Sequence, residues 1–394
     1  MSRLSEKESL LKYIADNKDY AIKVLDRLVR AKTVNPPGNE IEAAKVVMEE
    51  LERIGISYKK YEKEIGRANI IAQYGEGSPS LLILSHLDVV PEGEGWNYPP
   101  FETTMKDGKI YGRGTVDNKG SLASAILALK ALKELNITIQ GSIIVAGVAD
   151  EETGSAMGTL YLLEENLVSA DYVLVAEAMN GNIEIAEKGS AGGKLVSKGK
   201  QAHGSTPEKG INAIVKMSKL LTRLESFNFT YKPDKILGGP TINVGVIAGG
   251  VAGNVVPPSC EAQLDIRIVP GMDNISVKRD LENLIAKLKM EDPEINIEVD
   301  IPKSLPATSI SPDSPFIKTL SSTIYEVTGK KPQTFGIGGI SVGKFFILRG
   351  TPAPVFSCGD EGLDHMADEY ISVEELINNA KIFALLYYYL SKSQ

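Results

Sequence analysis

Three consecutive acidic residues, Asp150, Glu151 and Glu152, directly follow the apolar run GSIIVAGVA at residues 141–149. Neighbouring carboxylates disfavour one another's ionisation, and a buried carboxylate without a partner is costly. A bound cation would remove both costs. The cluster therefore indicates a metal site at the end of a buried strand.

Other side chains that bind metals stand at the ends of further short apolar runs. His86 follows LLILS, Glu177 follows YVLVA, and His365 lies in the loop after PVFS. Asp117 lies in the glycine-rich segment GRGTVDNKG, just before a helical pattern. An open α/β sheet binds ligands at the carboxyl ends of its strands, so these residues are expected to converge. Imidazoles and carboxylates together suit zinc or a similar divalent ion.

The acidic residues outnumber those that one tetrahedral zinc ion requires. This excess favours two ions about 3.5–4 Å apart that share a bridging carboxylate. We expect Asp117 to be the bridge. The remaining ligands divide as His86 and Glu177 on one ion, and Glu152 and His365 on the other.

Glu151 is the candidate general base. Neighbouring side chains of an extended backbone point to opposite sides, so Glu151 and Glu152 are not expected to bind the same ion. Glu151 is then free to take a proton from an activated water during a hydrolysis. Asp88 lies two residues beyond His86, on the same side of an extended chain, and is expected to hold the second imidazole nitrogen of His86.

Each of these residues also has a purely structural interpretation, because a single His or Asp more often satisfies a structural contact or faces solvent. The joint placement of the set favours metal binding. His86 and His365 are two of only three histidines in the chain, and both follow apolar runs. Asp150 is instead expected to be a solvated or capping acid.

The segment GISVG at residues 339–343 offers a competing chemistry. It matches the G-x-S-x-G turn of serine hydrolases, with His365 downstream of Ser341 and with Asp360 and Asp364 between them. No apolar strand leads into Ser341, and this interpretation leaves the strand-end residues without a role. We expect the surrounding segment GIGGISVG, with Gly338 and Gly339, to be a glycine-rich loop beside the substrate.

The elements that must position these residues alternate between strand and helix. Helical periodicity is clear at residues 39–55, where Gly55 is placed to end the helix, and at residues 121–135. The apolar runs between the helical segments are short and unbroken, which is typical of strands covered on both faces. This order predicts an α/β catalytic domain with three αβα layers and a mainly parallel sheet.

Residues 189–305 show a different order, β-α-β-β-α-β, which is the split βαβ pattern of a small ferredoxin-like domain. The catalytic pattern resumes after it. We therefore predict a discontinuous catalytic domain at 1–188 and 306–394 that carries an inserted α+β lid at 189–305.

Composition excludes several classes of protein. The net charge of -8, with no basic stripe, argues against nucleic-acid binding. The apolar runs are shorter than the roughly 20 residues that cross a bilayer, and the polar, acidic first residues lack a targeting pattern. These features predict a cytosolic protein without a membrane partner. Cys260 and Cys358 are expected to be buried small apolar residues.

In these motifs the chain resembles the co-catalytic metallo-exopeptidase family that includes succinyl-diaminopimelate desuccinylase, acetylornithine deacetylase, aminoacylase and glutamate carboxypeptidase. The matching segments follow the family's order along nearly the whole chain: SHLDVVP, GRGTVDNKG, DEETGS, AEA, GKQAHGSTPEKG, GNVVPPSCEAQLDIRIVPG and HMADEYI. The resemblance implies the two-domain fold and two zinc ions, with cobalt or manganese as alternatives. It implies the same roles for His86, Asp88, Asp117, Glu151, Glu152, Glu177 and His365.

The resemblance also implies roles for three residues of the lid. His203, supplied by the partner subunit of a homodimer formed through the lid, would stabilise the oxyanion, while Asn254 and Arg267 would hold substrate oxygens. Each also has a structural interpretation. His203 could cap a helix, Asn254 could serve a turn, and Arg267 could pair with Asp265 on the strand surface.

The substrate predicted by this resemblance is an N-acyl amino acid, with a short peptide as the alternative. The chain has Glu177 where the aminopeptidase branches of the family carry Asp, and in this it resembles the deacylase and carboxypeptidase branches. The desuccinylase pattern has Thr, Asp and Arg where this chain has Ile340, Val342 and Lys344, which predicts a less polar pocket. A catalytically silent, metal-dependent binding protein is a further hypothesis, since ligands alone do not prove turnover.

Overall fold

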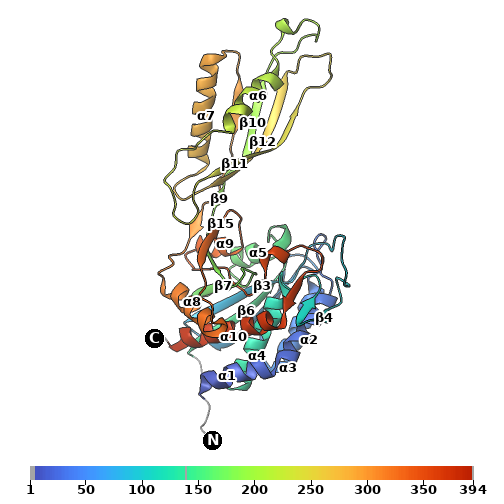
Figure 1. Ribbon diagram of the computed structural model, residues 1–394, viewed down its shortest axis with the longest axis vertical. Coiled ribbons are helices and arrows are strands. Elements are labelled where there is room, and N and C mark those ends of the chain that lie inside the picture. Colours follow the sequence, from blue (N-terminus) through green and yellow to red (C-terminus); the bar gives the residue numbers. More distant parts are fainter. Residues whose placement is uncertain (1–4, 138–139, 393–394) are drawn as a thin grey trace. The chain divides into compact units, whose positions relative to one another are not determined.

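The computed structural model describes residues 5–137 and 140–392, which form two compact units (Figure 1). The first unit contains residues 1–185, 310–335 and 341–394, and the second contains residues 186–309 and 336–340. The predicted boundaries after residues 188 and 305 differ slightly from these limits. Residues 336–340 belong to the second unit because their backbone pairs with it: the Lys188 N–H donates to the Ile337 carbonyl at 3.0 Å.

The first unit is built on a five-stranded sheet with the order β1-β2-β6-β3-β7. Strands β6, β3 and β7 run parallel, as predicted, whereas β2 and β1 are antiparallel to their neighbours. The five strands are β1 (Tyr58–Glu62), β2 (Ala68–Glu76), β3 (Ser80–His86), β6 (Gly141–Val148) and β7 (Tyr172–Val175). Three shorter strands form a separate antiparallel sheet, in the order β16 (Tyr370–Ser372), β5 (Lys109–Tyr111) and β4 (Thr104–Lys106).

Helices cover both faces of the five-stranded sheet, which gives the predicted three layers. Along β3, Leu81 and Ile83 face one hydrophobic core, while Leu82 and Leu84 face another, because successive side chains of a strand alternate. The first core packs under α1 (Glu6–Asp16), α2 (Lys18–Arg30), α3 (Ile41–Ile54), α4 (Lys119–Glu134), α8 (Pro315–Thr328) and α10 (Val373–Lys392). The second core packs under α5 (Thr159–Glu164) and α9 (Gly343–Ile347).

Local signals in the sequence set the ends of several helices. Helix α3 ends where predicted, because Gly55 adopts a left-handed conformation at φ 69° that closes the last turn. Ser5 caps the first helix and Ser314 caps α8, each accepting from a backbone N–H of the first turn. The periodicity predicted for α3 corresponds to one buried face, which contains Ala44, Val47, Leu51 and Ile54.

The second unit has the predicted β-α-β-β-α-β order. Its antiparallel sheet has the order β11-β12-β10-β13, with β9 paired to β12. Both long helices lie on one face, since the buried side chains of β12 alternate with exposed ones and pack with α6 and α7 in one core. The elements are β9 (Gly189–Ser190), β10 (Gly193–Lys198), α6 (Ala213–Leu224), β11 (Thr241–Gly249), β12 (Ser259–Ile268), α7 (Asn274–Glu291) and β13 (Ile297–Asp300).

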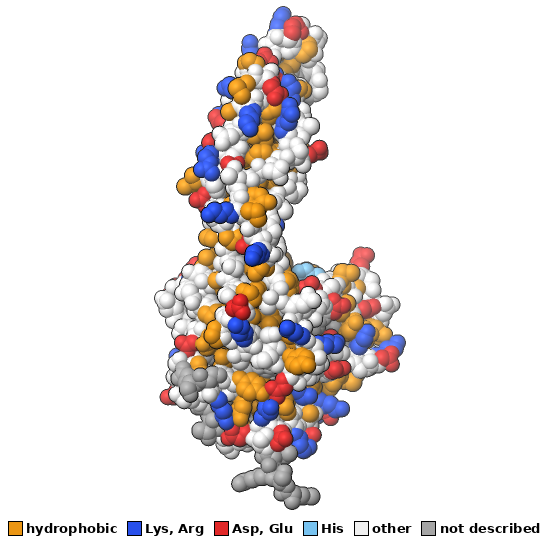
Figure 2. All heavy atoms as spheres, turned by 60° about the vertical axis from the view of Figure 1, so that its left-hand side comes forward, with side chains coloured by type: hydrophobic (Ala, Val, Ile, Leu, Met, Phe, Trp, Pro, Cys, Tyr) orange, Lys and Arg blue, Asp and Glu red, His pale blue; other side chains and the backbone are white. Residues whose placement is uncertain are grey.

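A further three-stranded sheet, ordered β14-β8-β15, includes the residues at which the chain passes from one unit to the other. Its strands are β14 (Thr308–Ser309), β8 (Ile183–Glu187) and β15 (Thr334–Ile337). Basic and acidic side chains are interspersed over the face shown in Figure 2. Cys260 and Cys358 are both free and buried, as predicted. None of the helices in the described part of the chain combines the length and apolar character needed to span a membrane.

Candidate metal centre

His86, Glu151 and Glu152 lie at the ends of two neighbouring parallel strands, β3 and β6. β3 and β6 pair in register with His86 opposite Val148, so both strands end at the same edge of the sheet. His86 is the last residue of β3, and the chain after β6 forms a short turn that contains Glu151 and Glu152. His86 is 1 % exposed, so its imidazole needs partners inside the protein.

Asp117 lies between the two imidazoles. Its Oδ1 is 2.9 Å from Nε2 of His86, and its Oδ2 is 3.3 Å from Nε2 of His365. Nε2 of His365 also lies 3.1 Å from Oε2 of Glu152. One carboxylate thus presents its two oxygens to two different imidazoles, which is the arrangement that a bridging ligand requires.

The described residues contain two overlapping groups whose ligand atoms lie within 4.8 Å of one another. One group is His86, Asp117 and Glu152, and the other is His86, Glu151 and Glu177. Two oxygens in these groups, Oε1 of Glu152 and Oε1 of Glu177, are buried and have no hydrogen-bond partner. Such orphaned carboxylate oxygens are what a bound cation would satisfy, so these side chains fit a divalent metal.

The position of Asp117 depends on a close approach between its loop and helix α4. A Cβ at Gly120, in the first turn of α4, would lie 2.2 Å from the carbonyl oxygen of Thr115. Only glycine permits this approach, which folds the loop back onto the helix start. The glycine-rich segment therefore brings Asp117 to the strand ends.

Asp88 makes a different contact from the one predicted. The backbone carbonyl oxygen of Asp88 lies 2.9 Å from Nδ1 of His86, whereas its carboxylate Oδ1 is 3.7 Å away. The carboxylate instead accepts from the backbone N–H groups of Glu151 and Glu152, at 3.1 and 3.2 Å. Asp88 therefore has two roles. Its backbone carbonyl orients the imidazole of His86, and its carboxylate orients the turn that carries Glu151 and Glu152.

Asp150 was expected to be a solvated or capping acid, but it is buried, and its side chain makes no cap hydrogen bond to the 3-10 turn that follows it. It is 5 % exposed, and its carboxylate accepts from Arg67 at 2.8 Å and from the Met157 N–H at 3.0 Å. Asn35 donates to Asp150 at 3.2 Å and to Asp88 at 2.8 Å, and so joins the two acids. Arg67 and Asn35 lie 83 and 115 residues from Asp150 in the chain, which is why local sequence could not reveal these two donors.

The backbone at the acidic turn is also not extended. Residues Glu151–Thr153 form a 3-10 turn that follows Asp150 in a left-handed conformation at φ 65°. The alternation argument that separated Glu151 from Glu152 therefore does not apply. Their side chains nevertheless enter different groups, Glu152 beside Asp117 and Glu151 beside Glu177.

The electrostatics of the site are those of an acidic cluster that needs a cation. Burial, followed by the charge of Asp117, raises the pKa of Glu152 to about 7. Burial and the charge of Glu151 raise the pKa of Glu177 well above its ordinary value. The hydrogen bond with Asp117, supported by the charge of Glu152, raises the pKa of His365 to about 9. The site thus contains more carboxylates than the two histidines can neutralise, which is why these pKa values are raised.

Two further pKa shifts follow from the same crowding. Burial raises the pKa of Glu151, and the charges of Asp117 and Asp88 raise it further, although His86 opposes this. For Asp117, burial works against ionisation, but the hydrogen bonds with His365 and His86 lower its pKa below the ordinary value. Asp117 is therefore the carboxylate that stays ionised at the centre of the cluster.

The predicted residues of the lid belong to the second unit. Nδ1 of the exposed His203 lies 2.7 Å from the Ser205 hydroxyl, and the neighbouring Gly204 N–H donates to the Asn254 carbonyl at 2.7 Å. His203 and Asn254 therefore lie on paired segments. Arg267 pairs with Asp265 at 3.0 Å and reaches the Gly338 carbonyl at 3.5 Å, which links it to the glycine-rich loop.

The glycine-rich loop differs from the prediction in which side chains it exposes. Val342 is buried in the second core of the first unit, and Lys344 is fully buried. Of Ile340, Val342 and Lys344, only Ile340 is exposed. Ile340 is therefore the one residue of the three that could make a substrate pocket less polar. Ser341 is buried, and its hydroxyl accepts from the Gly343 N–H at 3.1 Å. Nε2 of His365 faces carboxylates, which does not favour the serine-hydrolase interpretation.

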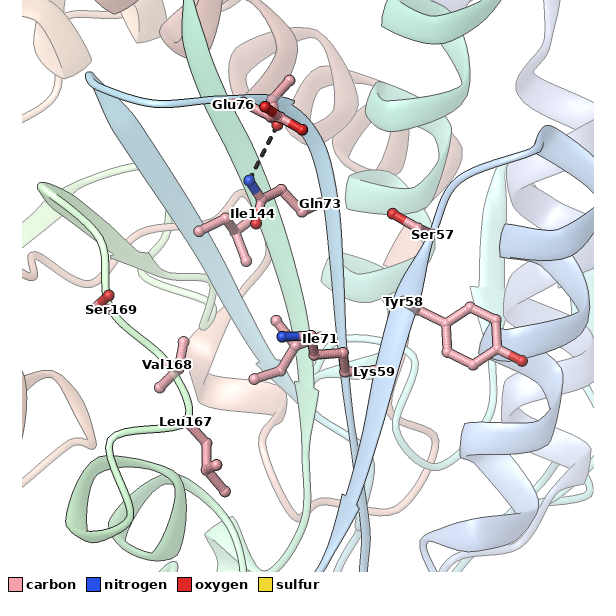
Figure 3. Close-up of a pocket in the computed structure, with 11 residues that line it drawn as sticks. Ser57, Tyr58, Lys59, Ile71, Gln73, Glu76, Ile144, Leu167, Val168 and Ser169 are labelled. Atoms are coloured by element: carbon pink, nitrogen blue, oxygen red, sulfur yellow. Dashed lines mark hydrogen bonds between the residues drawn. The ribbon is translucent and has the colours of Figure 1, made fainter.

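A separate cavity of about 390 Å³ lies against β1 and β2 of the first unit (Figure 3). It is lined by Ser57, Lys59, Ile71 and Ile144, and by residues 167–169. The Gln73 amide within it donates to the Gly75 carbonyl at 3.0 Å. Its lining contains no histidine and only one acid, Glu76, so the chemistry lies at the strand ends and not here.

Sequence reasoning missed several polar residues that hold the site together. Asn35 and Arg67 bind the acids next to the site, and Arg113 and Glu369 lie within hydrogen-bonding distance of its loops. Arg113 stands in GRGTVDNKG and Glu369 in HMADEYI, so both lie inside motifs that carry metal ligands. Their position four residues from Asp117 and from His365 was the available signal.

The buried His86, the exposed His365 and the carboxylates between them form a candidate metal centre at the strand ends of an α/β fold, which is the kind of site that a metal-dependent amidohydrolase requires. Residues 82–388 match Peptidase family M20/M25/M40, and the chain belongs to this family, as its motifs predicted.

Named relatives agree with this assignment. An uncharacterized metallohydrolase of Methanococcus maripaludis is 35% identical over 81% of this chain and 83% of its own. A probable succinyl-diaminopimelate desuccinylase of Staphylococcus epidermidis is 28% identical over 92% and 95% of the two chains. The crystal structure of aminopeptidase PepT from Bacillus cereus shares the fold, with a TM-score of 0.77 and 24% identity over 95% of this chain and 99% of that one.

Proposed function

We propose that this protein is a di-metal amidohydrolase that cleaves the amide bond of an N-acyl amino acid and releases the free amino acid. The observation that carries the proposal is the placement of Asp117, whose Oδ1 and Oδ2 lie 2.9 and 3.3 Å from the imidazoles of His86 and His365. A carboxylate shared in this way suits a pair of ions more than a single one.

In this proposal His86, Asp117 and Glu177 hold one ion, and Asp117, Glu152 and His365 hold the other. Nitrogen and oxygen ligands of this kind favour zinc, and cobalt or manganese could take its place. When bound, such ions supply Lewis-acid polarisation of the amide carbonyl and a water of lowered pKa. The orphaned oxygens of Glu152 and Glu177 support the assignment.

Glu151 is proposed to move the proton of the hydrolysis. It takes a proton from the attacking water and donates it to the leaving amine nitrogen as the amide bond breaks. Its raised pKa, caused first by burial, suits a group that must hold a proton for part of the cycle. The Asp88 carboxylate supports this role, since its hydrogen bond to the Glu151 N–H fixes the turn.

The second unit is proposed to bind the substrate. His203, supplied by the other subunit of a homodimer, donates to the oxygen that gains negative charge, while Asn254 and Arg267 hold the substrate's carboxylate or carbonyl oxygens. Support comes from the exposed position of His203 and from the contact of Arg267 with the Gly338 carbonyl. Gly338 and Gly339 offer backbone groups beside the substrate.

A homodimer formed through the second unit and a cytosolic location complete the proposal. β11 is the edge strand of its sheet, and Val246 and Ile247 on it are each 51% exposed. Val215 on the neighbouring helix α6 is also exposed. Exposed apolar side chains on an unpaired edge strand are a template for pairing with a second copy.

A substrate panel tests the proposed reaction. The metal-reconstituted protein is assayed with acetyl-ornithine, succinyl-diaminopimelate, other N-acetyl amino acids and short peptides, with added zinc, cobalt or manganese. Release of free amino acid from acylated substrates supports the proposal. Preferential cleavage of peptides would assign the protein as a metallo-carboxypeptidase or dipeptidase of the same family. Metal binding with no turnover across the panel would identify a binding protein instead.

A chemical control separates the metal reaction from serine chemistry. A chelator should abolish the activity and added metal should restore it, while an organophosphonate should leave it unchanged. The reverse pattern would assign the activity to Ser341.

A further inference from the structure

The carboxylate of Glu369 gathers the backbone of the loop that carries Asp117. Glu369 is fully buried, and its Oε1 accepts from the N–H groups of Val116 and Asp117 at 2.9 and 3.1 Å. Its Oε2 accepts from the Gly114 N–H at 3.0 Å. Three donors of one short loop therefore converge on a single side chain, which fixes the loop as charge-assisted hydrogen bonds do.

Arg113 connects the same carboxylate to the loop that carries His365. Its Nη1 donates to Oε2 of Glu369 at 2.7 Å and to the Met366 carbonyl at 3.1 Å. Its Nη2 donates to the His365 carbonyl at 3.0 Å. Arg113 is 1 % exposed, and its guanidinium lies 5.1 Å from the ring of Trp96. The fork of the guanidinium thus ties two ligand-bearing loops to each other.

His365 needs such support because its backbone is strained. It adopts a left-handed conformation at φ 63°, which residues other than glycine rarely adopt. The hydrogen bond from Arg113 to its carbonyl holds this conformation. The ring is thereby aimed at Asp117 and Glu152.

We propose that Arg113 and Glu369 are positioning residues that set the separation of Asp117 and His365, and so control binding of the ion on the His365 side of the centre. The proposal rests on the two-ion site of the proposed function. The ion on the side of His86 and Glu177 depends on this pair only through Asp117. The ion on the His365 side depends on the pair through both Asp117 and His365, so its binding step is the more sensitive of the two.

Glu369→Gln tests the proposal with little change in size. The Gln amide keeps one acceptor oxygen, but its NH₂ group cannot accept the hydrogen bonds that the second carboxylate oxygen accepts. Part of the loop that carries Asp117 therefore loses its hydrogen bonds. Metal-free full-length protein is titrated with Co²⁺, and visible absorption and calorimetry follow the two steps. His365→Ala and Glu177→Ala titrations assign each step to its side of the centre. Glu374→Gln, an exposed acid at the start of α10, is the matched control.

The expected result is a loss of affinity of about 10- to 100-fold at the His365 side, with a clearly smaller loss at the other step, which shares only Asp117 with the disturbed loops. Excess metal should restore the kcat of Glu369→Gln, because the chemistry itself is intact. Equal weakening of both steps, or unchanged binding at both, would overturn the proposal. So would a loss of kcat that saturating metal does not restore.

Arg113→Lys keeps the inference testable if Glu369→Gln does not fold. Lysine retains the charge beside Glu369 but cannot donate to the Glu369, Met366 and His365 oxygens in the same geometry. The same larger loss at the His365 side than at the other side is expected, and its absence would refute the proposal. These titrations do not require turnover. An inactive parent that binds two ions would refute the proposed function alone, whereas a parent that binds no metal would refute both.

Discussion

Glu152 and His365 stand 213 residues apart in the sequence, and Oε2 of Glu152 lies 3.1 Å from Nε2 of His365. The same imidazole lies 3.3 Å from Asp117. These side chains therefore already face one another around a common point, held by hydrogen bonds to the surrounding loops. A site assembled in this way loses less conformational entropy when a ligand binds.

Replacing Glu151 by Gln should separate metal binding from catalysis. Gln cannot carry a proton, so turnover should fall by about 10²- to 10⁴-fold. Elemental analysis should find nearly the same metal content as in the parent protein. Glu165→Gln, an exposed acid after α5, serves as the control. Hydrolysis at the parent rate would remove Glu151 from the mechanism.

Metal binding near neutral pH should release protons. The hydrogen bond with Asp117 raises the pKa of His365 to about 9, and burial raises the pKa of Glu152 to about 7. A divalent ion requires both groups in their deprotonated forms. Apparent affinity should therefore rise with pH up to about 9. Calorimetry in two buffers of different ionisation enthalpy measures the protons, and His365→Ala should release fewer. Identical heats in both buffers would contradict this prediction.

The metal-free protein should lose stability as the pH rises. The pKa of Glu152 is about 7 in the folded protein, against an ordinary value of 4.5. Between these two pH values the folded state binds more protons than the unfolded state, so the free energy of unfolding falls as the pH rises. His365, with a pKa of about 9 against 6.5, contributes stability that is fully present below 6.5 and is lost as the pH passes 9. Urea unfolding at several pH values checks this, and His365→Ala should flatten the upper window. Loss of the slope on adding metal is expected, and its persistence would count against a metal site.

Arg67→Ala should strongly destabilise the first unit. Arg67 makes two hydrogen bonds, at 2.7 and 2.8 Å, to the fully buried Glu40, and it also binds Asp150. Removing it leaves buried carboxylates without their cation, which should lower the free energy of unfolding by about 3–5 kcal/mol. Lys12→Ala, which breaks an exposed pair with Asp16, should cost about 0–1 kcal/mol. Equal effects of the two substitutions in urea unfolding would be inconsistent with a buried network.

Ile247→Glu should convert the proposed dimer into a monomer. A charge on the exposed edge strand β11 would have to be buried without a partner when a second copy binds. Sedimentation analysis measures the mass of the parent and the variant, with Ile65→Glu as a control at another exposed apolar residue. A parent protein that is monomeric at all concentrations would refute the dimer.

Several elements of the fold could be predicted from local sequence. Gly55 ends α3, the apolar run at residues 81–85 lies in β3, and the order of elements in 189–305 gives the second sheet. Such features depend on periodicity and on turn residues, which act over a few positions. The antiparallel pairing of β1 and β2 at one edge was not predictable in this way, since strand direction depends on partners distant in the chain.

The candidate site shows the same division between local and distant information. The strand-end positions of His86, Glu152 and Glu177 follow from the sequence. The carboxylate directions of Asp88 and Asp150 do not, because they depend on donors such as Asn35 and Arg67. The burial of Val342 and Lys344, which the sequence did not predict, means that these two side chains do not line the expected pocket.

The sequence by itself determined the family, the alternating α/β order and the set of residues with metal-binding chemistry, because each is written in residue types and short-range spacing. Only the tertiary structure decided that Asp117 turns one oxygen to His86 and the other to His365. It also decided that Glu369 and Arg113 hold the two ligand loops together. These relationships depend on side-chain directions and on contacts between distant segments, which arise only when the chain packs around a common core.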